Sequence, residues 1–329
     1  MLIMNDLLSI QNFSLAIHYE NRILPILHEI NLHIETGERV GLVGESGSGK
    51  SSLAKAILRL HEFNYSLLTE GGIFYKGENL LGMDAHGINS IRGNEISIVF
   101  QDPLSSMNPM FKVRKQIAEV LIHHKGVSHS DADDLIYDTF RELHLTPPER
   151  FMNAYPFQLS GGQCQRVMIA MALITVPKLL IADEITSSLD AIISEEILEL
   201  LDSYSRKQGT SVLMISHNLH TVRKFVDRIG ILYAGQLVEC LNCYYLPERA
   251  WHPYTRALFY CADAKRDEKG RFKSIDGYPP KPEMNIKGCP FYSRCEYHTD
   301  ICREEMPSSE TETGDWVKCH HADQIRNEQ

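Results

Sequence analysis

The stretch Gly44-Glu45-Ser46-Gly47-Ser48-Gly49-Lys50-Ser51 decides the fold. It matches the pattern G-x-x-x-x-G-K-[ST], in which backbone N–H groups converge on phosphate oxygens, the lysine reaches the β and γ phosphates and the hydroxyl ligates Mg²⁺. An apolar run at 39–43 precedes the stretch and a helical pattern at 53–60 follows it. This order of strand, glycine loop and helix favours a nucleotide site over an ordinary turn. The predicted site comprises Gly44, Glu45, Ser46, Gly47, Ser48, Gly49, Lys50, Ser51 and Ser52, with Ser51 on the metal ion.

The flanking sequence is typical of an α/β protein. Residues 26–35 alternate between apolar and polar side chains, which predicts a half-buried strand of an antiparallel β subdomain. Residues 113–145 show helical patterns without a strand between them, which predicts a helical insert at about 102–166. Further apolar runs, separated by helical patterns, predict parallel strands at 96–100, 179–182, 212–215 and 229–233.

The chain has 329 residues, more than one hydrophobic core usually organises. From about Arg266 the sequence changes to Lys, Gly, Pro and Cys with little periodicity, as in the segment 278–282. We therefore expect a nucleotide-binding domain over residues 1–262 and a small, loop-rich, cysteine-rich C-terminal domain over residues 263–329.

Composition excludes several classes of protein. With 43% hydrophobic and 23% charged residues the chain is neither disordered nor coiled-coil, and its net charge of −10 argues against binding to nucleic acid. The most apolar stretch, 167–182, is interrupted by Pro177 and Lys178, and is therefore too short to span a membrane. The first ten residues lack the basic region of a secretory signal. We expect the protein to stay in the cytoplasm.

Hydrolysis of a nucleotide requires carboxylates near the phosphate loop. The apolar run 179–182 ends in Asp183 and Glu184, which are suited to hold Mg²⁺ and to activate the attacking water, respectively. The alternative is that the two acids only close a strand. His217 follows the strand predicted at 211–216 and by itself is compatible with a buried structural histidine.

Four of the eight cysteines crowd the C-terminal end of the chain. They are separated by five, six and sixteen residues and lack the paired C-x-x-C knuckles that are typical of structural zinc. Four thiolates can hold either Zn²⁺ or an iron–sulfur cluster, and the ligand type does not decide between them. Cys240 and Cys243 form a C-x-x-C in and after an apparent strand, and we interpret them as unliganded. The candidate ligands are Cys289, Cys295, Cys302 and Cys319.

Between the loop and the carboxylates lies Leu159-Ser160-Gly161-Gly162-Gln163. With this signature the sequence resembles the ATP-binding subunits of ABC transporters, since six elements follow that family's order. Ser160 is also a good helix N-cap, and the two interpretations are compatible. The ordered elements are the phosphate loop, Gln101 after 98–100, the signature, Asp183-Glu184, Ser188-Leu189-Asp190 and His217.

The resemblance implies that two such domains meet head to tail, with each ATP between the phosphate loop of one and the signature of the other. It implies that Gln101 contacts Mg²⁺ and the attacking water, that His217 binds the γ-phosphate and that Tyr19 stacks on adenine. Two departures leave the turnover rate open: Ile185 stands where the family has proline, and Cys164 stands where a basic residue is frequent. The implied contacts to the nucleotide also include Ser160, Gly161, Gly162, Gln163 and Asp190.

The C-terminal part of the sequence narrows the resemblance to one group of ABC transporter ATPases. Residues 251–258, Trp-His-Pro-Tyr-Thr-Arg-Ala-Leu, and residues 288–291, Gly-Cys-Pro-Phe, resemble segments of the dipeptide, oligopeptide and nickel importer ATPases. Because similar subunits carry a [4Fe-4S] cluster, the resemblance favours that cluster over zinc at the four cysteines.

This resemblance implies an ATPase that couples energy to an importer of peptides, or of a related small solute such as nickel or a metal chelate. The implied partners are a second ABC ATPase, identical or homologous, two membrane permease subunits and, indirectly, an extracytoplasmic solute-binding protein. The chain would then lie peripherally on the cytoplasmic face of the inner membrane. The alternative is a soluble ABC-type ATPase that acts on nucleic acid or the ribosome.

Overall fold

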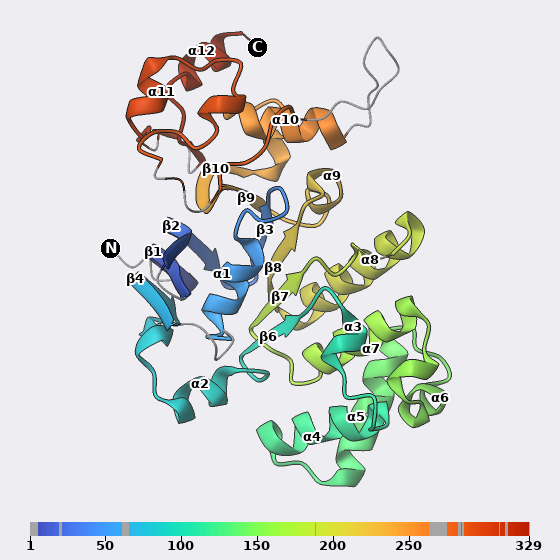
Figure 1. Ribbon diagram of the computed structural model, residues 1–329. Helices are drawn as coiled ribbons and strands as arrows, with labels where there is room; N and C mark the ends of the chain where they lie inside the picture. The colour runs from blue at the N-terminus through green and yellow to red at the C-terminus, as the bar shows by residue number, and fades with distance from the viewer. Residues whose placement is uncertain are drawn as a thin grey trace. The chain divides into compact units, whose positions relative to one another are not determined.

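The structure is a computed structural model that describes residues 6–19, 22–60, 66–187, 189–262, 275–281, 284, 286–308, 310–312 and 315–328 (Figure 1). The described residues group into two compact units. The first unit draws on residues 1–34, 39–81 and 215–329, and the second on residues 35–38 and 82–214.

The first unit contains an antiparallel sheet of four strands in the order β2-β1-β4-β5. The predicted alternation over 26–35 is confirmed, because Ile30, Leu32 and Ile34 are buried whereas Asn31 and Glu35 are exposed. This sheet is the expected antiparallel β subdomain. Its strands are β1 (Asp6–Tyr19), β2 (Arg22–Glu35), β4 (Ser66–Tyr75) and β5 (Glu78–Asn79).

The first unit also holds five strands of a mixed sheet, in the order β11-β12-β10-β9-β3. Strands β3 and β9 are parallel, whereas β10 is antiparallel to both β9 and β12. The C-terminal segment thus adds its own strands to the sheet that carries the phosphate loop. The expected division of the chain at residue 262 stays a prediction. The strands are β3 (Arg39–Val43), β9 (Arg228–Tyr233), β10 (Gln236–Asn242), β11 (Glu310–Glu312) and β12 (Asp315–Val317).

Short helices complete this unit. A small apolar core of Trp251, Val317, Cys319, Ala322 and Ile325 packs the end of the chain against the segment after β10. The helices are α1 (Lys50–Ile57), α9 (Leu219–Val222), α10 (Pro253–Ala262), α11 (Asp300–Glu304) and α12 (Ala322–Asn327), with short 3-10 turns η1 (Leu80–Gly82), η3 (Cys243–Tyr245) and η4 (Tyr292–Arg294).

The second unit contains three strands in the order β8-β7-β6, and β6 and β7 are parallel. All residues of β7 and β8 are buried, as expected for continuous apolar runs covered on both faces. The strands predicted at 96–100, 179–182 and 212–215 are therefore confirmed. Their bounds are β6 (Ile96–Val99), β7 (Leu179–Asp183) and β8 (Ser211–Ser216).

The predicted helical insert is also present in the second unit. Between β6 and β7 the chain forms helices only, and the apolar stripes of α4 and α5 are buried at Val113, Ile117, Ile136 and Phe140. None of the described helices is long and apolar enough to cross a membrane. The helices of the unit are α2 (Ala85–Ile91), α3 (Pro103–Ser106), α4 (Val113–Lys125), α5 (His129–Glu142), α6 (Pro148–Asn153), the turn η2 (Pro156–Gln158), α7 (Gly161–Leu173) and α8 (Ala191–Gln208).

Candidate nucleotide-binding and hydrolysis site

The phosphate loop connects β3 to α1, as the sequence predicts. Its first residue must be glycine, because a Cβ on Gly44 would lie 2.1 Å from the carbonyl oxygen of Leu232. Gly49, the N-cap of α1, has φ of 106°, which side chains rarely tolerate. The two glycines therefore permit the tight path of the loop, and α1 directs the positive end of its dipole toward the loop.

Lys50 lies inside the loop. Its side chain is only 4% exposed, and Nζ donates to the carbonyl oxygens of Gly44 (2.8 Å) and Glu45 (2.9 Å) and to Oγ of Ser48 (3.4 Å). These neutral acceptors are weaker partners for an ammonium group than phosphate oxygens are. Lys50 is therefore placed where a bound triphosphate would compete for its protons. Ser51 and Ser52 are half-buried in the first turn of α1.

The loop is anchored by distant parts of the first unit. The backbone N–H of Glu45 donates to the hydroxyl of Tyr254 at 2.8 Å, and the backbone N–H of Gly235 donates to the carbonyl oxygen of Ser48 at 2.9 Å. The carboxylate of Glu45 accepts two hydrogen bonds from Arg294, at 2.7 and 2.9 Å. The sequence pattern did not reveal these anchors.

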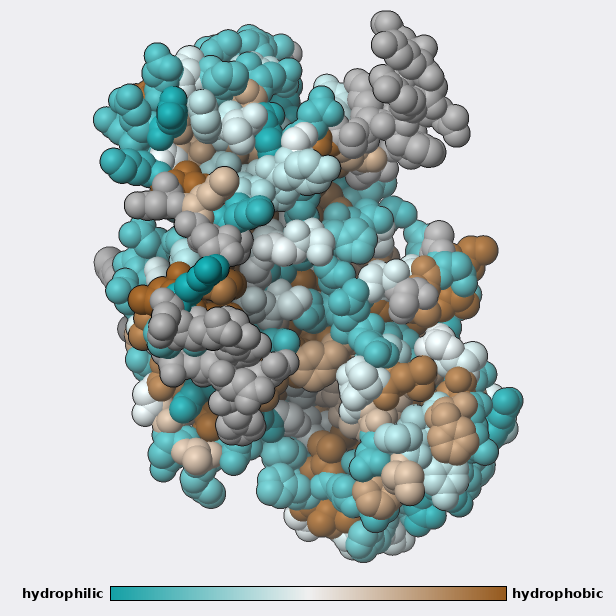
Figure 2. Space-filling view, in the orientation of Figure 1, coloured by the Kyte–Doolittle hydropathy of each residue, from teal (hydrophilic) through white to brown (hydrophobic). Residues whose placement is uncertain are grey.

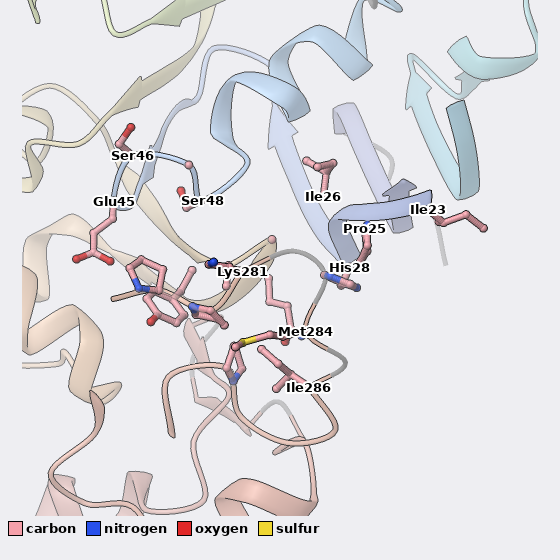
Figure 3. Close-up of a pocket in the computed structure, with 18 residues that line it drawn as sticks. Ile23, Pro25, Ile26, His28, Glu45, Ser46, Ser48, Lys281, Met284 and Ile286 are labelled. Atoms are coloured by element: carbon pink, nitrogen blue, oxygen red, sulfur yellow. The ribbon is translucent and has the colours of Figure 1, made fainter. Parts of the chain in front are cut away.

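A pocket of about 510 Å³ opens beside the phosphate loop (Figure 3). Ser46 and Ser48 line it from the loop, His28 from β2, and Met284 and Ile286 from the C-terminal segment. Burial lowers the pKa of His28 from its usual value, so this part of the wall is neutral. The volume is suited to a small ligand such as a nucleoside. The side chain of Tyr19, the predicted adenine contact, lies outside the described residues.

The carboxylates of the second unit lie at the end of β7. Asp183 is the last residue of the strand and is 5% exposed, and Glu184 follows it with φ of 49°. A left-handed backbone at a residue other than glycine costs about 1 kcal/mol and is frequent at functional sites. The side chain of Gln101 donates to the carboxylate of Glu184 and to the hydroxyl of Ser187, both at 3.2 Å. The second unit thus brings together Gln101 and Glu184, which the sequence separates by 83 positions.

The signature begins helix α7. Ser160 is its N-cap, and a capping box joins Ser160 and Gln163 by two reciprocal hydrogen bonds, which confirms the structural role predicted for Ser160. Ser160 and Gly161 at the helix start are exposed, and Gly162 is half-buried. Cys164 is fully buried, and burial raises the pKa of its thiol to about 11. Cys164 thus occupies a buried position on α7.

Two further predicted residues occupy exposed positions. Asp190 is the N-cap of α8, and its carboxylate accepts a hydrogen bond from the backbone N–H of Ile193 at 3.0 Å. His217 follows β8 and its side chain is exposed, so it is not a buried structural histidine. Ser188 lies outside the described residues. The first unit therefore carries the phosphate loop and His217, and the second carries Gln101, the signature, the carboxylate pair and Asp190.

The four C-terminal cysteines line one small pocket of the first unit, together with Phe291, His252 and His321. The backbone N–H of Cys289 donates to the carbonyl oxygen of Cys302 at 2.8 Å, and the ring of His321 contacts Sγ of Cys302 at 3.4 Å. Burial raises the pKa of Cys289 and Cys319 to about 12 and that of Cys295 to about 11. Within the described ranges, no three Cys, His, Asp or Glu side chains form a group that could hold a metal ion.

The loop and the carboxylate pair are those of a P-loop ATPase. A model of the ABC transporter family matches residues 27–187, and a model of the oligopeptide/dipeptide transporter C-terminal region matches residues 238–302. The chain belongs to the ATP-binding proteins of the ABC transporter family and is an ATPase of that class.

Similar proteins cover nearly the whole chain. A probable peptide ABC transporter ATP-binding protein of Sinorhizobium fredii is 38% identical over 98% of this chain and 96% of the relative. The oligopeptide transport ATP-binding protein AppD of Bacillus subtilis is 37% identical over 96% of this chain and 97% of the relative. This chain also resembles a solved dimeric ATP-binding cassette in a post-hydrolysis state with ADP and phosphate bound. The match covers 72% of this chain and 98% of the solved chain, with 29% identity and a TM-score of 0.64.

Proposed function

We propose that this chain is the ATP-hydrolysing, energy-coupling subunit of an importer for di- or oligopeptides, or for a related small solute such as nickel or a metal chelate. One observation carries the proposal: a single chain combines an intact phosphate loop with the C-terminal region of oligopeptide and dipeptide transporters. Two similar proteins are named for peptide or oligopeptide transport, and this supports peptides as the cargo class. No observation favours the alternative of an ATPase that acts on nucleic acid or the ribosome.

The residues of the site have complementary roles in this proposal. In the ATP complex, Nζ of Lys50 donates to the β and γ phosphates in place of the loop carbonyl oxygens. Ser51 and Asp183 offer oxygen ligands of the type that Mg²⁺ prefers. When bound, Mg²⁺ neutralises charge on the phosphates. Glu184 accepts the proton of the attacking water, Gln101 orients that carboxylate through their hydrogen bond, and His217 donates to the γ-phosphate.

A second ATPase subunit, identical or homologous, completes each nucleotide site in the proposal. Ser160 and Gly161 are exposed at the start of α7, where the helix dipole favours an anion. The similar solved cassette is a dimer with ADP and phosphate bound, which supports the same arrangement. The signature of one subunit would then contact the phosphates that the loop of the other subunit holds.

The proposed membrane partners would dock on the helical part of the second unit. Figure 2 shows apolar residues on the surface of this helical part. Within the same part of the chain, Met110 is 77% exposed and Phe157 is 67% exposed. Large contiguous patches of exposed apolar residues mark contact sites for other proteins. Met110 follows Gln101 by nine positions, so a permease docked there would lie on the segment that leads from Gln101. The chain would thus lie peripherally on the cytoplasmic face of the inner membrane.

For the four-cysteine pocket we propose a [4Fe-4S] cluster, with zinc as the alternative. A single Zn²⁺ holds its thiolates close together at Zn–S distances of about 2.3 Å, whereas a cluster spreads them around a larger core. The four thiols line one pocket, which supports a centre that they share. Such a centre would supply the positive charge that stabilises buried thiolates and would connect the short C-terminal elements.

Purification from membranes tests the function. The tagged chain should be recovered from detergent-solubilised membranes together with two hydrophobic permease subunits and a second ATPase. Addition of the solute-binding protein loaded with peptide should stimulate ATP hydrolysis by that complex. Recovery only from the soluble fraction, with hydrolysis stimulated by nucleic acid, would overturn the proposal.

A further inference from the structure

Arg294 connects the cysteine-rich segment to the phosphate loop. It lies one residue before Cys295, and its guanidinium forms a two-pronged ion pair with the carboxylate of Glu45, the second residue of the loop. The side chain of Arg294 is only 2% exposed, whereas that of Glu45 is 27% exposed. The pair is therefore a shielded contact of fixed geometry, unlike a mobile surface salt bridge.

The other partners of Arg294 fix its position. Its guanidinium donates to the hydroxyl of Tyr233 (3.1 Å) and to the carbonyl oxygens of Asp276 (2.9 Å) and Ile275 (3.2 Å). It also lies within 5.8 Å of the ring centres of Tyr233 and Phe291. With these contacts on several sides, the guanidinium is held in one orientation toward the loop.

Glu45 brings a negative charge into the phosphate loop. It is the only acid among residues 44–52, which surround a predicted site for a triphosphate. A carboxylate next to phosphates repels them unless a cation neutralises it. In Figure 3 the side chain of Glu45 points away from Ser46 and Ser48. Its carboxylate accepts both hydrogen bonds from Arg294.

We propose that Arg294 is a positioning residue for nucleotide binding: it neutralises Glu45 and holds that carboxylate away from the phosphates. The inference rests on the proposed function only in taking ATP as the ligand of the loop. Through this pair the affinity for ATP depends on the C-terminal segment, which no local feature of the loop motif indicates. The backbone of Glu45 has its own anchor in the hydroxyl of Tyr254, so the loop keeps its path when the ion pair is removed.

The test measures the affinity of purified variants for Mg²⁺-ATP with hydrolysis blocked. Arg294→Gln should raise the Kd for ATP by about tenfold, a typical size for coupling between two sites. The increase should shrink in high salt, because salt screens the repulsion from the bare carboxylate. In steady-state assays the same variant should raise KM much more than it lowers kcat, since the repulsion acts equally on bound ATP and on the transition state.

A second substitution separates this role from a merely structural one. Adding Glu45→Gln to Arg294→Gln removes the bare carboxylate and should return the Kd to within about threefold of wild type. Glu45→Gln alone removes a negative charge from the loop while Arg294 stays, and it should bind ATP at least as tightly as wild type. This variant also tests the proposal if Arg294→Gln fails to fold.

The matched control is Arg39→Gln. Arg39 is 12% exposed and pairs with Asp227, but it begins β3, about 16 Å along the strand from the loop. Its substitution should leave the Kd unchanged. A wild-type Kd for Arg294→Gln, a double variant as weak as Arg294→Gln, or weaker binding by Glu45→Gln would each overturn the proposal. Failure of the wild-type protein to bind ATP would instead contradict the proposed function.

Discussion

Gln101 donates a hydrogen bond to the carboxylate of Glu184, with 3.2 Å between Nε2 and Oε2. Gln101 lies two residues after the end of β6, and Glu184 comes directly after β7. Because these strands are parallel neighbours, their carboxyl ends present both side chains at one edge of the sheet. The hydrogen bond links the start of the helical insert to the residue proposed to activate water.

Replacement of Glu184 by glutamine should abolish hydrolysis and preserve binding. The amide keeps an oxygen that can accept from Gln101 but can no longer accept a proton, so kcat should fall by about 100-fold or more. The Kd for ATP should change little, because Lys50 and the loop backbone are untouched. Phosphate release and equilibrium binding of ATP measure the two effects, and near-normal turnover would refute the role of Glu184.

Replacement of Gln101 by alanine should affect hydrolysis less than Glu184→Gln does. Without its hydrogen bond the Glu184 carboxylate is less well oriented, so kcat should fall by about tenfold at an unchanged Kd for ATP. Gln116→Ala is a suitable comparison, since Gln116 makes its hydrogen bonds within the helical insert, to the backbone of Asn108 and Phe111. Equal loss of kcat in the two variants would mean that the Gln101–Glu184 contact has no specific role.

The metal content of the four-cysteine pocket is open to direct analysis. Protein purified without oxygen should be brown and contain iron and sulfide in nearly equal amounts. Cys302→Ala should lose both and melt at a lower temperature, because the centre connects short elements that have little core of their own. Cys243→Ala, outside the pocket, should keep them. A colourless protein with stoichiometric zinc would contradict the cluster assignment.

The stability of the first unit should depend on the protonation of Glu239. This side chain is fully buried on β10, and burial raises its pKa to about 7 from a usual 4.5, although the backbone N–H groups of Trp251 and His252 donate to it. A raised carboxyl pKa costs stability when the group ionises. The contribution of Glu239 to the free energy of unfolding is neutral below about pH 4.5 and becomes progressively unfavourable as pH rises to about 7.

Glu239→Gln should therefore stabilise the protein at about pH 8, by about 3 kcal/mol, and change little at about pH 4.5. Burial lowers the pKa of the neighbouring His252 to about 3, which costs stability as pH falls below 6.5. Because both proteins carry His252, its effect cancels in the comparison. Thermal unfolding of the two proteins across this pH range measures the difference, and parallel profiles would contradict a raised pKa at Glu239.

Sequence patterns predicted those strands, helices and caps that are determined by residues close together in the chain. The strand before the phosphate loop, the helix after it and the N-cap role of Ser160 follow from apolar periodicity and from capping chemistry within a few positions. The burial of residues 30–35 in β2 followed from simple alternation. The roles assigned to the site residues in nucleotide binding and hydrolysis stay predictions.

Contacts between residues far apart in the chain could not be predicted from any sequence pattern. Arg294 and Tyr254 anchor Glu45 from 249 and 209 positions away, and each lies in a segment whose pattern says nothing about its partner. The pairing of β12 with β10 was missed for a related reason: a three-residue strand is too short to show alternation. The left-handed backbone at Glu184 depends on the fold around it, so the residue type alone does not disclose it.

The most direct test of the account is the association state of the Glu184→Gln variant, alone and with its partner ATPase subunit. With Mg²⁺-ATP, analytical ultracentrifugation should show a dimer that falls apart when ATP is removed, and Ser160→Arg should prevent its formation. If the variant binds ATP and yet stays monomeric with either partner, the account of an ATP-closed transport motor is wrong.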